Sequence, residues 1–126
     1  MDSKIMFEVL LEEQIVLHEL ERHIGDKLIP FPSDVKYPQS TLGYEVENGR
    51  VVKLSLYRKN LTKLPACLSQ LSQLRFLSLL TNSFTEVPEV IKELGQLSDL
   101  NLGHNPLSNL PPFLADMENL ETLYVD

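Results

Sequence analysis

Cysteine, basic residues and long apolar runs are all scarce in this chain of 126 residues. Its single cysteine, Cys67, excludes an intramolecular disulfide and a metal site built from several cysteines. The 11 basic residues are outnumbered by 18 acidic ones, and the net charge of −7 argues against binding to nucleic acid. No apolar run approaches the roughly 20 residues that a membrane-spanning helix needs.

These absences also predict the cellular compartment of the protein. The N-terminus lacks the basic segment followed by an apolar segment that a secretory signal would show. A lone cysteine fits a reducing compartment. We therefore expect a cytoplasmic protein with neither membrane nor nucleic acid as a partner. A length of 126 residues with 43% hydrophobic content fits one folded structural domain.

Apolar residues return every 23 residues in the second part of the chain. Each unit starts with three aliphatic residues in the spacing φ-x-x-φ-x-φ, where φ is the aliphatic residue, and the starts are Val51, Leu74, Leu97 and Leu120. Seven positions are apolar in each of the three full units. Alternation of apolar and polar residues at the start of each unit predicts a short strand. Apolar pairs three residues apart, behind a proline, predict one turn of helix.

The pattern L-x-x-L-x-L-x-x-N-x-L-x-x-L-P resembles the typical 23-residue leucine-rich repeat of intracellular proteins. The resemblance covers residues 51–126, with units 51–73, 74–96 and 97–119 and a partial unit 120–126. It implies an α/β fold, a solenoid with a short parallel β-sheet on the concave face and helical or irregular segments on the convex face.

The resemblance also implies a structural role for Asn82 and Asn105, which would hydrogen-bond backbone groups of neighbouring units. In the first unit Lys59 takes the position of these asparagines. A buried lysine without a partner would be unfavourable. We therefore expect the Lys59 side chain to point outward from a distorted or capped turn.

Residues 1–50 lack the repeat and are expected to form an N-terminal cap of helix, connector and first hairpin strand. Ser3 and Gly25 are suitable ends for a helix that runs to about Ile24. We expect its apolar stripe to contain Leu10, Leu17, Leu20 and Ile24. We expect its solvent-exposed side to contain Glu12, Glu13, Glu19, Glu21 and Arg22. Prolines 30, 32 and 38 then predict an irregular connector.

Asn48 and Gly49 predict a two-residue hairpin turn between a strand at 43–47 and the first repeat strand. Such a hairpin would cover the edge of the sheet, and the helix would cover the end of its core. The segment 43–57 resembles the N-terminal caps of short archaeal and bacterial leucine-rich repeat proteins, in which a helix precedes such a hairpin. Plant receptor ectodomains have similar hairpins but with paired cysteines, which this chain lacks.

Candidates for catalysis or metal binding are few. His18 and His23 are five residues apart on the predicted helix, a spacing that does not place them on one face. Cys67 has no partner that the sequence can identify, and we expect an inert thiol. The chain has no glycine-rich phosphate-binding loop. We therefore expect no enzyme activity, no cofactor and no metal.

The outward residues of the predicted strands stack in columns on the concave face, which repeat proteins use to bind partners. The predicted partner-binding residues are Lys53, Ser55, Tyr57, Arg58, Phe76, Ser78, Leu80, Asp99, Asn101, His104, Thr122 and Tyr124. Their aromatic and apolar members are of the types that anchor interfaces, although single exposed apolar residues are also common on ordinary surfaces. We expect a scaffold that binds a protein of unknown identity. The alternative is an N-terminal fragment or regulatory module of a larger repeat-containing signalling enzyme, such as a GTPase with attached repeats.

The last layer, formed by Leu120, Leu123 and Val125, is followed by no further unit in this sequence. Three explanations stay open: a fragment of a longer repeat protein, self-association through the uncapped C-terminal strand, or a final strand that is itself an adequate cap.

Charge also differs along the repeats, with basic residues mainly at or before Arg75 and acidic residues after it. This uneven distribution of charge has three possible meanings. It would steer an acidic partner to the first unit, it would favour head-to-tail contacts between copies, or the charged residues are simply solvated.

Overall fold

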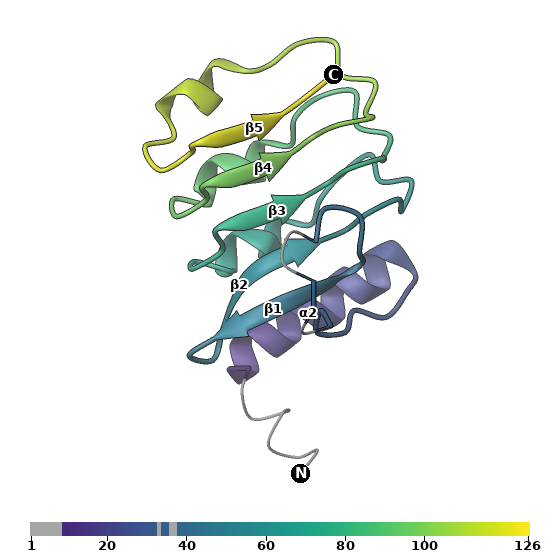
Figure 1. Cartoon of the computed structure of the whole chain (residues 1–126), viewed down its shortest axis with the longest axis vertical. Coiled ribbons are helices and arrows are strands. Elements are labelled where there is room, and N and C mark those ends of the chain that lie inside the picture. The colour runs from purple at the N-terminus through teal and green to yellow at the C-terminus, as the bar shows by residue number, and fades with distance from the viewer. Residues whose placement is uncertain (1–8, 33, 36–37) are drawn as a thin grey trace.

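The computed structural model describes residues 9–32, 34–35 and 38–126, which form a mixed α/β fold. In this part of the chain, one α-helix, α2 (Leu11–Ile24), lies at the N-terminal end of a five-stranded sheet with strand order β1-β2-β3-β4-β5 (Figure 1). The strands are β1 (Gly43–Glu47), β2 (Arg50–Ser55), β3 (Phe76–Ser78), β4 (Asp99–Asn101) and β5 (Thr122–Tyr124). The general prediction of an α/β fold is confirmed.

Strands β1 and β2 form the predicted antiparallel hairpin. Glu47 pairs with Arg50 across a turn in which Asn48 and Gly49 have φ angles of 51° and 80°. Two successive left-handed residues are what a type I′ turn requires, and asparagine followed by glycine adopts them at little steric cost. The predicted hairpin at this position is therefore confirmed.

Strands β2 to β5 are parallel, and each step across the sheet advances the sequence by 23 residues. One set of partners runs through Lys53, Phe76, Asp99 and Thr122. Between successive strands lie three 3-10 helices, η1 (Ala66–Gln70), η2 (Glu89–Glu93) and η3 (Pro112–Asp116). The predicted helical turns are thus present in the tighter 3-10 form.

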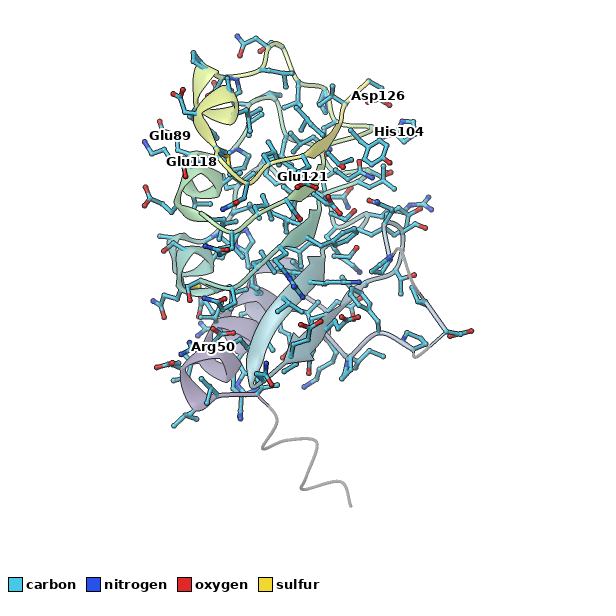
Figure 2. The ribbon with its side chains drawn as sticks, turned by 60° about the vertical axis from the view of Figure 1, so that its left-hand side comes forward. Arg50, Glu89, His104, Glu118, Glu121 and Asp126 are labelled. Carbon is cyan, nitrogen blue, oxygen red and sulfur yellow. The ribbon has the colours of Figure 1, made fainter. Side chains whose placement is uncertain are left out.

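The core lies between the sheet and the helical segments. Figure 2 shows these segments on one side of the sheet and the connector that precedes β1 on the other. Leu54, Leu77 and Leu100 point into the core and are at most 1% exposed, whereas Leu123 on the last strand is only partly buried. Each strand therefore depends on the next one to exclude water from its leucine.

The turn after β3 is built around the buried side chain of Asn82. Its Nδ2 donates to the carbonyl oxygens of Leu56 and Leu79 at 2.9 and 3.1 Å. Its Oδ1 accepts the backbone N–H groups of Lys59 and Leu61 at 2.9 and 3.0 Å. One amide therefore satisfies backbone groups of its own turn and of the preceding one.

Asn105 repeats this arrangement in the turn after β4. Its Nδ2 donates to the carbonyl oxygens of Leu79 and Leu102 at 2.9 and 3.0 Å. Its Oδ1 accepts the N–H of Phe84 at 3.1 Å. In the described part of the chain, no buried side-chain nitrogen or oxygen lacks a hydrogen-bond partner.

The first turn follows a similar path without an asparagine. Arg58 has a left-handed φ of 57°, as Thr81 and His104 have at the equivalent positions, with 59° and 54°. Lys59 does not extend freely into solvent as expected. Its Nζ lies 2.6 Å from Asp26 Oδ2, beyond the end of α2, and only 22% of its side chain is exposed. The lysine therefore links the first turn to the helix.

Glu13 anchors α2 to the hairpin. Its side chain is fully buried, its Oε1 accepts the Val51 N–H at 2.7 Å, and its Oε2 accepts a bond from Arg50 at 3.2 Å. The prediction that Glu13 lies on the exposed side is wrong, because the hairpin covers that side and supplies the donors. Leu10, expected in the apolar stripe, is 39% exposed, and Val16 is buried instead.

Helix α2 begins at Leu11, and the predicted cap Ser3 lies outside the described residues. Leu10 has an extended ψ of 144°, and its N–H donates to the Gly49 carbonyl at 2.9 Å. This bond to the hairpin turn, which no local pattern indicates, holds the chain extended just before the helix. At the other end Gly25 terminates the helix as predicted, with a φ of 72°.

We expect Glu13→Ala to lower the free energy of unfolding by about 1.5–3 kcal/mol, because a buried N–H loses a charged acceptor. Glu12→Ala is the matched control. Glu12 contacts the same Arg50 at 3.1 Å but is exposed, so its loss should cost less than about 1 kcal/mol. Urea unfolding followed by circular dichroism measures both values. Equal losses in the two variants would contradict the anchoring role of Glu13.

We expect Asn82→Ala to lower the free energy of unfolding by at least about 2 kcal/mol, since each buried group left unpaired costs about 1–3 kcal/mol. The control is Asn119→Ala, which removes a single exposed bond to the Gly95 carbonyl and should change stability by less than about 0.5 kcal/mol. Thermal unfolding compares the two. A similar small effect in both variants would refute the proposed importance of the buried amide.

Candidate partner-binding face

Strand pairing places eight of the predicted partner-binding residues on one face of the sheet, in two registered rows. Across β2 to β5, the first row is Lys53, Phe76, Asp99 and Thr122, and the second is Ser55, Ser78, Asn101 and Tyr124. Residues two apart in a strand point to the same side, so both rows face the same way. The remaining four follow the strand ends: Tyr57 and Leu80 are partly buried, and Arg58 and His104 are exposed.

The connector between α2 and β1 covers the middle of this face. The Gln39 carbonyl oxygen accepts bonds from the hydroxyls of Ser55 and Ser78 at 3.3 and 2.6 Å. Its side-chain Oε1 accepts a bond from Asn101 Nδ2 at 2.7 Å. Both serines consequently have no exposed surface. A single connector residue thus contacts three neighbouring strands.

The expectation that all the outward side chains stand exposed is therefore wrong for four of them. Ser55, Phe76, Ser78 and Asn101 are all buried. The prolines predicted an irregular connector, but no sequence pattern indicated that it lies on the sheet. Gln39 has no periodic counterpart in the chain, so its contact with the sheet was missed.

The connector also pairs with the outer edge of β1. Tyr44 N–H donates to the Ile29 carbonyl at 3.1 Å, and Phe31 N–H donates to the Tyr44 carbonyl at 2.8 Å. Gly43, with a φ of 152°, lies so close to Ile29 and Phe31 that a side chain there would collide with them. The hairpin strand expected to cover the sheet edge is thus itself covered.

Of the eight residues in the two rows, Tyr124 is the most exposed, and we define the open β4–β5 face as Asp99, Thr122 and Tyr124. Tyr124 is 53% exposed, and the other two are partly exposed. Figure 2 shows His104 and Asp126 side by side beyond the end of β5. The Asp126 carboxylate accepts the His104 N–H at 2.7 Å and lies 3.0 Å from His104 Nδ1. This face is the candidate site for a partner.

Basic residues around the first strands are paired with acidic residues of the cap. Ion pairs join Lys53 with Glu45, Arg75 with Glu47 and Lys59 with Asp26, at 3.8, 2.8 and 2.6 Å. The hydrogen bond from Lys59 holds the pKa of Asp26 below its ordinary value. The stabilisation from that pair is therefore present at neutral pH and is lost only as the pH falls through the lowered pKa. The first unit thus has less unpaired positive charge than its sequence suggests.

The remaining candidates for chemistry are Cys67 and the histidines. Burial raises the pKa of the Cys67 thiol and the nearby Glu19 adds to this effect, so the nucleophilic thiolate is disfavoured. His23 Nε2 lies 2.8 Å from the Lys63 carbonyl. Within residues 9–32, 34–35 and 38–126, no three or more histidine, cysteine, aspartate or glutamate side chains form a group that could hold a metal ion.

A cavity of about 180 Å³ lies between α2 and the segment around Tyr44. Its lining includes Leu17, His18 and Glu21 from the helix. Burial raises the pKa of the Tyr44 phenol, and the charge of Glu21 adds to this effect. The phenol therefore stays protonated at neutral pH and acts here as a packing group.

Gln39→Ala and Asn101→Ala should each lower the free energy of unfolding by about 0.5–1.5 kcal/mol. The double variant should lose clearly less than the sum, because both changes remove the same hydrogen bond. Gln70→Ala, on the exposed side of η1, should be nearly neutral and additive with Asn101→Ala. Urea unfolding of this set measures the coupling, and strict additivity of Gln39 and Asn101 would disprove the contact.

Comparison with protein-family models and with curated protein sequences gives no match to this chain. None of the helices in the described residues is long and apolar enough to cross a membrane.

Proposed function

We propose that the chain is a leucine-rich repeat solenoid that acts as a non-catalytic, cytoplasmic protein-interaction module. The regular step of 23 residues between parallel strands supports this proposal. The buried asparagine in the turns after β3 and β4, and the 3-10 helix after each proline, support it as well. Each unit buries its leucines against its neighbours, and such contacts between adjacent units stabilise repeat proteins.

The observation that carries the binding role is the open β4–β5 face. Tyr124 presents an aromatic ring with 53% exposure on a sheet where the connector residue Gln39 covers Ser55, Ser78 and Asn101 of the neighbouring strands. Tyrosine is a common interface anchor because it buries a large rigid ring while its hydroxyl stays hydrogen-bonded. Asp99 and Thr122 add polar groups beside it on the same face. A protein partner would therefore contact this part of the sheet.

Site-specific photocrosslinking tests the proposal. A photoreactive phenylalanine analogue at position 124 should form adducts with a discrete protein partner in cells that express the full chain. The same analogue at Glu89 is the matched control, since Glu89 is also exposed but lies on the helical side of the molecule (Figure 2). We expect adducts from position 124 and none of the same mass from position 89.

The masses of the adducts separate the outcomes. An adduct of twice the chain mass identifies a second copy of this chain as the partner. Equal adducts from both positions, or none from position 124, would refute binding through the open β4–β5 face.

A further inference from the structure

Asp99 and Tyr124 lie diagonally across neighbouring strands of the open β4–β5 face. Asp99 pairs with Thr122, and Asn101, two residues further along β4, pairs with Tyr124. Strands lie about 4.8 Å apart and residues two apart in a strand about 6.6 Å, which places the two Cα atoms roughly 8 Å apart. A planar guanidinium group fits this spacing, because it can pair with a carboxylate at its edge while its face rests on an aromatic ring.

Asp99 has no ion pair within the described part of the chain. Lys53, the basic residue of the same row, lies two strands away beyond Phe76 and is paired with Glu45. Other basic residues that form ion pairs, such as Lys59, Arg75 and Lys92, pair with acidic residues outside this face. The Asp99 carboxylate is thus partly exposed and not neutralised.

The surroundings add more negative charge. Residues 93–126 contain no lysine or arginine, and their six acidic residues are Glu93, Asp99, Asp116, Glu118, Glu121 and Asp126. Figure 2 shows Glu121 at the beginning of β5 and Asp126 beyond its other end. Carboxylates therefore lie at both ends of the strand that carries Tyr124, and the local field favours a positively charged partner.

Resting on the function proposed above, we propose that the open β4–β5 face selects a basic partner segment through one arginine, which pairs with Asp99 and stacks on Tyr124. Arginine suits this position better than lysine, because its guanidinium is planar, binds carboxylates through two bonds and stacks on rings. Gln39 covers Ser78 of β3 and Asn101 of β4, so the segment lies over Asp99 and along β5. An acidic segment is repelled by the same carboxylates.

Fluorescence anisotropy with defined peptides tests this inference. The probe is a fluorescein-labelled nonapeptide in which arginine alternates with valine, titrated with the full chain at physiological salt. Two matched probes carry lysine or glutamate in place of arginine. We expect the arginine peptide to bind about three- to tenfold more tightly than the lysine peptide, and the glutamate peptide not to bind.

Variants locate the interaction. Asp99→Asn and Tyr124→Ala should each weaken binding of the arginine peptide about three- to tenfold. Tyr124→Phe should keep the affinity, because the ring face is retained. Glu86→Gln removes the same charge from an exposed residue outside the strands and should leave the affinity within about twofold. Circular dichroism confirms that each variant is folded.

Several results would overturn the inference: no binding of the arginine peptide, equal affinity for arginine and lysine peptides, or equal losses in Asp99→Asn and Glu86→Gln. The last result would mean that general attraction between opposite charges accounts for the binding. Any of these together with adducts at position 124 in the crosslinking experiment would leave the interaction function standing and remove only the choice of an arginine-bearing partner.

Discussion

The buried amides of Asn82 and Asn105, in the turns after β3 and β4, make the contacts on which the rest of the sheet depends. Where β3 and β4 end, the chain bends sharply and leaves backbone donors and acceptors away from water, which must find partners. The amide of Asn82 supplies two donors and an acceptor at one point, so it serves its own turn and the one before it. Because Asn105 does the same one unit later, successive turns stack in register. The rows on the sheet face follow from that alignment.

The N-terminal end solves the same problem with charged groups. The Lys59 ammonium group can donate hydrogen bonds but cannot accept them as an amide oxygen does, and the backbone N–H of Lys59 is satisfied by Asn82 of the next turn. Its ammonium group instead reaches Asp26, while Glu13 accepts the first N–H of the repeat region from Val51. A buried carboxylate tolerates few arrangements, because each one must supply donors. We infer that these contacts orient α2 across the end of the core.

The elements that repeat were predictable, and those that occur once were not. The 23-residue period of apolar positions predicted the strands, the helical turns and their register, since each is a local pattern reinforced by its copies. Asn48 and Gly49 predicted the hairpin for an equally local reason. Glu13 and Gln39 took part in no such pattern. Glu13 bonds a group 38 residues away, and Gln39 bonds groups 16 or more residues away. A helical wheel or a strand alternation describes only the immediate sequence neighbourhood of a residue. The candidate face was therefore predicted in outline, but its covered half was not.

The connector and the cap together decide which charges of the sheet surface remain unpaired. The cap supplies Glu45, Glu47 and Asp26 to the basic residues of the first two units, and Gln39 removes Ser55 and Ser78 from solvent. On β4 Gln39 contacts Asn101, but Asp99 stays partly exposed and Tyr124 on β5 is 53% exposed, so both keep their negative surroundings. Intramolecular pairing neutralises much of the positive charge near the first strands, whereas Asp99 has no ion pair within the described residues. The surface potential of β4 and β5 therefore favours a positively charged partner, whereas the basic first unit alone would attract a negatively charged one.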